Sequence, residues 1–195
     1  MKFKILCPVL FIAILNGCQG DRPLEKLKLT ADIKYDKFVK SYDVSTPFYD
    51  NMLIRGSVDA KSNRIIYVQL YTDLVFFEEW GYIETSIDTD GNRHEVTQIS
   101  SDVDCYSEFL GCELTEGIGI TLSKDFLESH RNGFEIKAYG AQEKIITVPR
   151  QLIESFLLGL DKAIQQSKNK PGGVQPCNSA DGEKVGEPRL CGQNG

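Results

Sequence analysis

The feature that most constrains this chain is a succession of short segments with the two-residue period of β-strands, separated by polar turn residues. The clearest segment covers residues 64–70, where Ile65, Ile66, Tyr67 and Val68 are β-branched or aromatic. Short strands at this close spacing favour antiparallel pairing, because consecutive antiparallel strands need only a tight turn between them. We predict strands over residues 27–30, 38–42, 52–58, 64–70, 82–87, 93–99, 119–122, 134–139 and 144–148.

Two turn sequences predict how some of these strands pair. Asp90-Gly91 joins the fifth and sixth predicted strands, and an Asp-Gly pair between alternating segments is a strong hairpin signal. Residues 140–142 are a short polar turn between the last two predicted strands, which should therefore form a second hairpin.

Two helices complete the pattern. Ser123 has the character of a helix N-cap, with Asp125 in the first turn, and predicts a short helix that ends near Asn132-Gly133. A longer helix begins at Pro149, and its apolar stripe has a 3.6-residue period. We expect the stripe to pack on one face of the sheet, with a dimer interface as the alternative. Its residues are Leu152, Ile153, Phe156, Leu157, Leu160 and Ile164.

Together these elements predict an α+β fold that is mainly antiparallel β. The sheet is expected to be sandwich-like or curled, with one short helix and a C-terminal amphipathic helix packed on it. Residues 27–166 form the predicted single β-rich domain. The segment 167–195 is rich in Gly and Pro without apolar periodicity, and we predict that this tail is disordered.

The N-terminal region has the three parts of a secretory signal. Lys2 and Lys4 are followed by an apolar run of about 11 residues, which is too short to span a bilayer as a helix. The run ends in Leu15-Asn16-Gly17-Cys18, which resembles the lipobox of bacterial lipoprotein precursors, although Asn16 departs from the small residue usual there.

The resemblance implies cleavage after residue 17, acylation of Cys18 and a tether over residues 18–26 that leads to the domain. Gln19 in place of Asp then favours the outer membrane over the inner membrane. The alternative is an ordinary secreted protein in which Cys18 forms a disulfide.

Charge narrows the class of partner. The formal net charge is −6, and loss of the two lysines of the signal would make it −8. An acidic chain without a Lys/Arg cluster is a poor candidate for binding nucleic acid or anionic lipid head groups. The expected partners are therefore the membrane, through the lipid anchor, and an envelope protein.

The six cysteines divide unevenly. Cys7 leaves with the signal and Cys18 carries the lipid, so four cysteines remain for disulfides in an oxidising compartment. Three pairings are possible, and we favour the two that close short local loops. These are Cys105–Cys112 and Cys177–Cys191.

Two stretches are candidate binding surfaces. The acidic stretch around the Cys105–Cys112 pair contains Asp102, Asp104, Glu108 and Glu113, and a disulfide-closed loop could present these carboxylates to a basic partner or simply be solvated. The other stretch, residues 74–80, is dense in large apolar residues and holds the single tryptophan. It predicts either an exposed anchor patch or part of the core at a strand connection, with Phe76, Phe77 and Trp80 as its main residues.

The sequence contains few residues or motifs typical of catalytic or metal-binding sites. The run from Asp88 to Asn92 contains a calcium-like pattern, but Gly91 comes too early for an EF-hand loop and a hairpin turn explains the run without metal. His94 and His130 are expected to be structural or solvated. There is no G-x-S-x-G, H-E-x-x-H or phosphate-loop motif, so we expect no metal and no cofactor.

The leading hypothesis is a lipid-anchored envelope protein that acts as a binding or assembly module facing the periplasm. The alternatives are a periplasmic enzyme or an enzyme inhibitor, and a location in the inner membrane or on the cell surface. The body also resembles uncharacterised envelope lipoproteins of Gram-negative bacteria, through its Tyr-rich strand, the hairpin from Trp80 to Gly91 and the Cys105/Cys112 loop. That resemblance implies no specific activity.

Overall fold

The computed structural model describes residues 29–107 and 111–169. The signal, Cys18, the tether, Glu108 and the Cys177–Cys191 pair lie outside the described residues. The described elements are β1 (Asp32–Asp36), β2 (Ser41–Ser45), β3 (Met52–Asp59), β4 (Ile65–Phe77), β5 (Thr85–Asp88), β6 (Arg93–Ser107), β7 (Gly111–Leu122), α1 (Lys124–Ser129), β8 (Gly133–Tyr139), β9 (Glu143–Pro149) and α2 (Arg150–Lys168).

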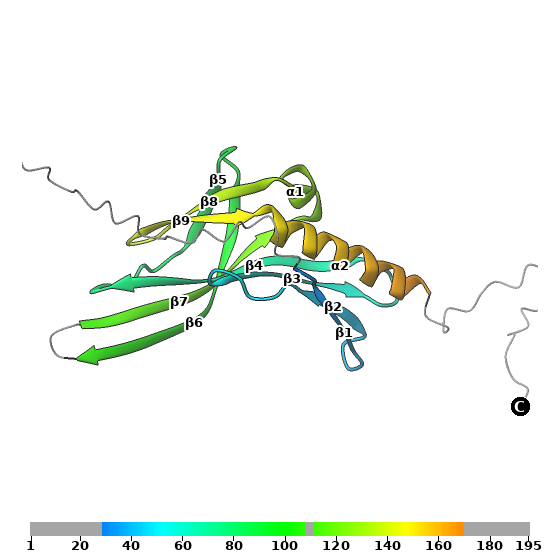
Figure 1. Ribbon diagram of the computed structural model, residues 1–195, viewed down its shortest axis with the longest axis horizontal. Coiled ribbons are helices and arrows are strands. Elements are labelled where there is room, and N and C mark those ends of the chain that lie inside the picture. Colours follow the sequence, from blue (N-terminus) through cyan, green and yellow to red (C-terminus); the bar gives the residue numbers. More distant parts are fainter. Residues whose placement is uncertain (1–28, 108–110, 170–195) are drawn as a thin grey trace, which may run out of the picture.

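In the described residues, nine strands form one antiparallel sheet in the order β1-β2-β3-β4-β7-β6-β5-β8-β9. The sheet curls into a half-barrel, and the described residues also contain the two helices α1 and α2 (Figure 1). The predicted class, mainly antiparallel β with a short helix and a C-terminal helix, is confirmed. Of the two architectures that the sequence left open, the curled sheet is the one that forms.

Both predicted hairpins are present. Thr85 pairs with Glu95 across the Asp90-Gly91 turn, and Gly91 has the positive φ of +85° that this turn requires. Strands β8 and β9 pair along their whole length, from Gly133↔Pro149 to Tyr139↔Glu143.

One predicted strand is wrong in its position. Residues 38–40 belong to a turn, because the Asp36 carboxylate accepts hydrogen bonds from the backbone amides of Phe38 at 2.7 Å and Val39 at 3.3 Å. The local side-chain bond outcompetes the strand pattern there. The strand begins again at Ser41, and the predicted first strand at 27–30 has no counterpart in its described half, Leu29 and Thr30.

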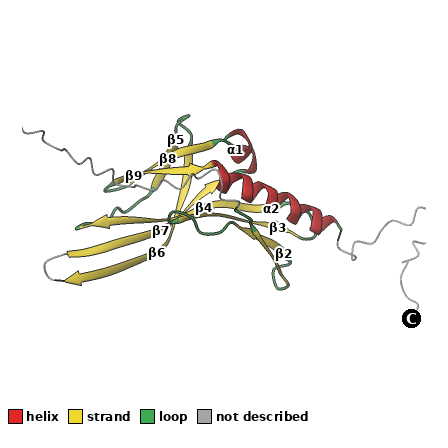
Figure 2. Cartoon of the chain, viewed as in Figure 1, coloured by secondary structure: helices red, strands yellow, loops and turns green. Residues whose placement is uncertain are grey.

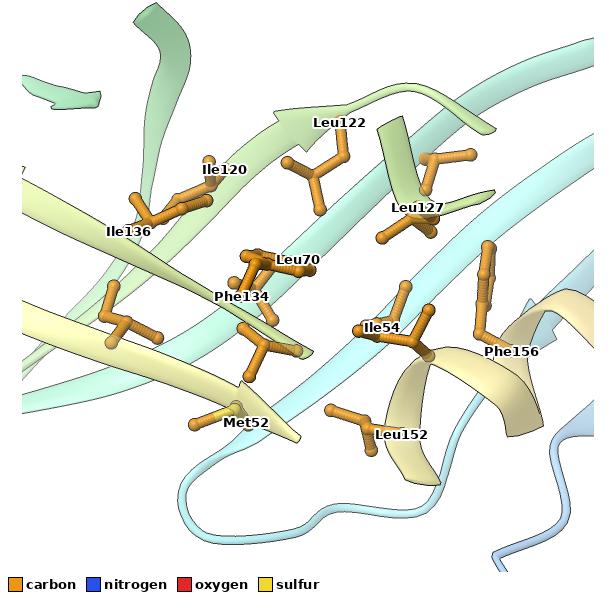
Figure 3. Packing of buried hydrophobic residues seen from close by; sticks show 14 of the residues in the cluster. Met52, Ile54, Leu70, Ile120, Leu122, Leu127, Phe134, Ile136, Leu152 and Phe156 are labelled. Atoms are coloured by element: carbon orange, nitrogen blue, oxygen red, sulfur yellow. The ribbon is translucent and has the colours of Figure 1, made fainter. Parts of the chain in front are cut away.

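Helix α2 lies along the sheet and contacts strands near both of its ends, β1, β2 and β3 on one side and β8 and β9 on the other (Figures 1 and 2). Its apolar stripe is buried except for the half-buried Ile164, so the stripe packs on the sheet as predicted. Figure 3 shows Leu152 and Phe156 of this helix beside Ile54 of β3, with Leu127 of α1 close by. The helix therefore closes the open side of the half-barrel.

The fit of α2 on the sheet depends on two glycines. A Cβ at Gly159 would lie 2.7 Å from the Cβ of Ala31 and 2.9 Å from Cγ1 of Val44. A Cβ at Gly56 would lie 2.9 Å from the ring of Phe156. Gly159 costs the helix about 1 kcal/mol relative to Ala. Because it has no side chain, it lets α2 approach Ala31 and Val44 closely.

Candidate binding surface

Three strands continue beyond the rest of the sheet and form a projecting arm (Figure 1). Strand β3 pairs with β4 only as far as Met52↔Thr72, and β5 pairs with β6 only from Thr85↔Glu95 to Ile87↔Arg93. Beyond these points β4, β7 and β6 pair only with one another. We call the three-stranded extension of residues 73–77, 100–107 and 111–117 the arm.

The predicted Cys105–Cys112 disulfide joins the last part of the arm. The two cysteines are direct partners in the β6–β7 register, and their Cα atoms are 4.1 Å apart. The disulfide ties the ends of the two strands together.

The arm is acidic and has no basic side chain. No Lys or Arg occurs between Arg93 and Lys124, nor between Arg64 and Phe77. Asp102 and Asp104 are exposed on β6, and Glu113, the register partner of Asp104, is half-buried on β7. Three of the four acidic residues predicted from the sequence therefore lie together, while Glu108 is outside the described residues.

The outer edge of β6 is open along the arm. No strand of the described residues pairs with β6 there on the side away from β7. The backbone amide of Val103 donates instead to the Asp102 carboxylate at 2.9 Å, and Gln98 Nε2 donates to the Ser100 carbonyl at 2.7 Å. Side chains of β6 itself thus form hydrogen bonds with the Val103 amide and the Ser100 carbonyl at this edge.

The two faces of the arm differ. On the concave face, Val103 lies beside Leu114 and Phe76, since these residues are register partners. On the convex face, Asp102 and Asp104 point outward with their own partners, Thr115 and Glu113. An extended segment added to the β6 edge would present alternate side chains to an apolar face and to an acidic face.

A loop of residues 78–84, which we call the bridging loop, runs from the end of β4 to β5 over the concave face. Gly81 sits directly on the ring of Phe76, and a Cβ there would clash with the ring. The Glu116 carboxylate on β7 accepts hydrogen bonds from the amides of Tyr82 at 2.8 Å and Ile83 at 3.2 Å. Glu116, only 2% exposed, therefore holds the middle of this loop.

The backbone of the bridging loop is strained at two places. Glu78 has φ +69° and Tyr82 has φ +45°, values that non-glycine residues rarely adopt. Such strain persists where surrounding contacts impose it, and it is concentrated at functional sites. At Tyr82 the backbone amide donates to Glu116, and the Tyr82 side chain is exposed.

A pocket of about 320 Å³ opens between the bridging loop and the root of the arm. Its wall combines aromatic and aliphatic groups with carboxylates and contains no Lys or Arg. An apolar side chain with a polar or cationic end fits such a wall. The lining residues are Trp80, Tyr82, Ile83, Glu84, Gln98, Ser101 and Glu116.

The structure separates the three aromatic residues predicted from the sequence. Phe76 is 1% exposed and belongs to the core, so it is not part of an exposed patch. Phe77 is 64% exposed on the convex face, because successive residues of a strand point to opposite faces. Trp80 is half-buried and lines the pocket.

Six residues of the pocket were not among the site residues predicted from the sequence, and these are Tyr82, Ile83, Glu84, Gln98, Ser101 and Glu116. Gln98 and Ser101 share the concave face of β6 only because a bulge shifts the register between Gln98 and Ser100. Glu116 lies in a regular strand pattern, and nothing in its neighbours indicates that its partners are Tyr82 and Ile83, more than thirty residues away. Register and long-range pairing are not encoded in local periodicity.

Both histidines lie around the short helix α1. His94 Nε2 is 3.0 Å from Asp88 Oδ2, and His130 Nε2 is 3.2 Å from Asp90 Oδ2. The ring of Phe126 lies between the two imidazoles, 4.9 Å from His94 and 4.2 Å from His130 between centroids. The histidines thus join the β5–β6 turn to α1.

Asp88 organises the β5–β6 turn. Its carboxylate accepts hydrogen bonds from the amides of Asp90 and Asn92, at 2.9 and 2.8 Å, and from the Asn92 side chain. Burial alone would raise the pKa of Asp88, but these bonds and the His94 contact lower it from 3.8 to about 2. The same bonds account for the calcium-like sequence pattern as a turn.

Ser129, His130 and Asp90 form a chain of contacts that superficially resembles a catalytic triad. Ser129 Oγ is 3.0 Å from His130 Nδ1, but Nδ1 also lies 2.9 Å from the Phe126 carbonyl. A carbonyl can only accept, so Nδ1 carries the proton and cannot take one from Ser129. The contacts therefore close the end of α1 and do not activate a nucleophile.

Metal sites and membrane-spanning helices are both absent from the described residues. No group of three or more His, Cys, Asp or Glu side chains in that part of the chain is placed to hold a metal ion. Neither helix of the described residues has the length and apolar composition needed to cross a bilayer. Comparison with protein-family models, curated proteins and solved structures finds no match for this chain.

Proposed function

We propose that this chain is a lipid-anchored protein of the bacterial envelope that works as a binding or assembly module facing the periplasm. The lipobox-like sequence from Leu15 to Cys18 supports the anchor, and Gln19 supports the outer membrane as its location. The observation that carries the binding function is the arm, which combines exposed carboxylates, an open strand edge and a pocket at its root.

The open edge of β6 favours an extended partner segment. Such a segment adds to a sheet through backbone hydrogen bonds, and the pockets for its alternate side chains provide specificity. The side-chain bonds that now occupy Val103 and Ser100 are exposed and local, so an added strand can replace them.

The charge of the arm selects the residues of that segment. Side chains of an added strand that fall on the convex face meet Asp102 and Asp104, where cationic groups are favourable and acidic groups are not. Side chains on the concave face meet Val103 and the pocket, where apolar groups are buried. The partner segment therefore alternates basic and apolar residues.

The same charges disfavour pairing between two copies of this protein through β6. Antiparallel pairing of two β6 edges would bring Asp102 and Asp104 of both copies close together, and natural proteins use such acidic edges to prevent self-association. A catalytic role has weaker support. Glu116, the buried carboxylate of the pocket, holds the bridging loop with both of its oxygens.

The first test is site-specific photo-crosslinking in intact cells that carry the full-length protein. A photoreactive residue at Val103, 49% exposed on the arm, should capture one reproducible envelope partner. The matched position is Leu158, 64% exposed on α2, which should capture none. Equal patterns from the two positions, or no adduct at Val103, would remove the arm as the binding surface.

The second test measures binding of a short peptide in which lysine and apolar residues alternate. N-methylation of the amides on one edge of the peptide should abolish binding, whereas N-methylation on the other edge should leave it unchanged, because an added strand uses only one edge. Trp80, the single tryptophan, reports on the pocket through its fluorescence. Equal effects of the two methylation patterns would contradict strand addition.

The matched protein variants are Asp102→Lys/Asp104→Lys on the arm and Glu135→Lys at an exposed position of β8. Reversal of the two arm charges should weaken peptide binding about tenfold or more at low salt, and the β8 variant should leave it unchanged. A similar loss in both variants would show that only the net charge of the protein matters.

A further inference from the structure

The turn between β1 and β2, residues 37–40, is the most exposed apolar feature of the described chain. Phe38 is 84% exposed and Val39 is 66% exposed, and they are neighbours at the tip of a hairpin. Burial in the fold does not explain either side chain. A large aromatic and a β-branched residue together at a hairpin tip indicate contact with something outside the described residues.

The turn is built to project these two side chains. The Asp36 carboxylate accepts the backbone amides of both Phe38 and Val39, and Lys40 closes the turn with φ +56°. Asp36 and Ser41 are register partners at its base. The backbone is therefore satisfied internally, and the two apolar side chains are left outside.

Lysines surround the apolar tip. Lys37 and Lys40 flank Phe38 and Val39, and the ammonium of Lys37 lies 5.1 Å from the centroid of the Phe38 ring. Within the described residues, no ion pair joins Lys37 or Lys40 to a carboxylate. The tip is basic although the whole protein is acidic.

Neighbouring carboxylates at this end are already engaged by hydrogen bonds. Asp36 holds its own turn, and Asp59 holds the adjacent β3–β4 turn through Lys61 and Ser62. That second turn touches the first, because the Ala60 amide donates to the Lys40 carbonyl at 2.9 Å. Lys61 lies in that second turn, where its charge interacts with the Asp59 carboxylate.

We propose that the β1–β2 turn inserts Phe38 and Val39 into the interface of an anionic bilayer, with Lys37 and Lys40 against the lipid phosphates. Aromatic and aliphatic side chains favour the boundary between head groups and acyl chains, and adjacent lysines bind the negative surface of the bilayer. The turn is thus a second membrane contact beside the lipid.

This inference rests on the proposed lipid anchor, and the chain lengths allow both contacts on one surface. Fully extended, residues 18–28 reach about 35 Å, and the chain from Leu29 to Phe38 is at most about 30 Å long. The tether is therefore long enough for Cys18 and Phe38 to reach the same bilayer. A protein held by its lipid has the tip at high local concentration near the same bilayer. A weak contact is therefore sufficient to fix the orientation of the domain.

The test uses the full-length protein, purified in detergent from the membranes of the bacterium that expresses it, in vesicles of phosphatidylethanolamine and phosphatidylglycerol whose acyl chains carry bromine. In a Phe38→Trp/Trp80→Phe variant the fluorescence should shift to shorter wavelength and be quenched by the brominated chains. The unsubstituted protein is the matched control, because its single Trp80 lies at the root of the arm and should remain unquenched.

Three outcomes are distinguishable. Flotation with the vesicles and quenching only in the Phe38→Trp/Trp80→Phe variant supports the inference. Flotation without quenching overturns the inference and leaves the lipid anchor intact. A protein that does not float with the vesicles has no anchor, and the inference then falls together with the proposed function.

The lysines are tested by Lys37→Ser/Lys40→Ser in the same Phe38→Trp/Trp80→Phe background. Quenching should decrease in this variant, and it should also decrease in the parent on vesicles of neutral phosphatidylcholine. The exposed Lys162→Ser on α2 is the control and should have no effect. Equal quenching on anionic and neutral vesicles would contradict the electrostatic part of the proposal.

Discussion

The β1–β2 turn and the arm are both exposed, but they differ in size, in charge and in the contacts that support them. The turn presents Phe38 and Val39 on a short hairpin, among lysines, and its backbone is held by the Asp36 carboxylate and by the Ala60 amide. The arm is long and acidic, and a disulfide joins two of its strands. The bridging loop contacts its concave face through Glu116. One region is small and basic, and the other is large and acidic.

The two regions also lie at opposite ends of β4. The β1–β2 turn touches the β3–β4 turn, where β4 begins, whereas Phe77 at the end of β4 pairs with Glu113 in the arm. A strand of 13 residues is roughly 40 Å long. A domain held at a bilayer by its basic end would therefore carry its acidic arm away from the membrane, where a partner can reach it.

The largest expected effect concerns the support of the arm. Glu116→Ala removes a buried carboxylate and leaves the amides of Tyr82 and Ile83 without a partner, so we expect a loss of about 3 kcal/mol in the free energy of unfolding. Urea denaturation measures this loss. Glu113→Gln on the same strand should change stability by less than about 0.5 kcal/mol, and equal effects of the two substitutions would contradict the role of Glu116.

Removal of the disulfide should loosen the arm alone. In Cys105→Ser/Cys112→Ser the free energy of local opening should fall by about 2 to 3 kcal/mol, because the disulfide closes a loop with a sequence separation of seven residues. Amides of β6 and β7 beyond Ser100 should then exchange about 30-fold faster or more, as followed by mass spectrometry. Uniform acceleration over β1, β2 and the arm would show that the two regions are not independent.

The turns held by Asp88 and Asp36 differ in the burial of their carboxylates. Asp88→Ala should cost about 2 kcal/mol, since the pKa of the buried Asp88 is lowered to about 2 by its hydrogen bonds. Asp36 is half-buried, and Asp36→Ala should cost less than about 1 kcal/mol. Thermal unfolding compares the two, and an equal cost would mean that burial of the Asp88 turn is irrelevant.

The same group predicts a pH dependence. The folded pKa of Asp88 is lower than its value in the unfolded chain, so its contribution to stability is complete above about pH 4 and is lost as the pH falls toward 2. Asp88→Asn should flatten the stability profile in this range. An unchanged profile would contradict the proposed hydrogen-bond network.

The smallest expected effect concerns the tip. Phe38→Ser and Val39→Ser should each change the free energy of unfolding by less than about 0.5 kcal/mol, because these side chains have almost no contact to lose. The buried neighbour Val44→Ser is the matched control and should cost more than about 2 kcal/mol. Strong destabilisation by Phe38→Ser would show that the tip serves the fold.

The same two regions show how far the sequence predicts the structure. Strand periodicity, the helix stripe and the short-range disulfide are local signals, and they predict the elements, the Cys105–Cys112 bond and the acidic loop. They do not predict that the three strands β4, β7 and β6 extend beyond their neighbours, because that depends on register between distant segments. The alternation of Phe38 to Tyr42 predicts a strand at the tip, and this prediction is wrong because the hydrogen bonds of Asp36 form a turn there.

Amide hydrogen exchange of the lipidated protein on anionic vesicles tests the account most directly, because one experiment reports on both ends. Attachment to the vesicles should slow exchange at residues 37–40 and leave residues 101–105 unchanged. Addition of the alternating basic peptide should then slow exchange at residues 101–105 without affecting the turn. Protection of the arm by the vesicles alone, or of the turn by the peptide, would contradict the proposal that the turn contacts the membrane and the arm binds the partner.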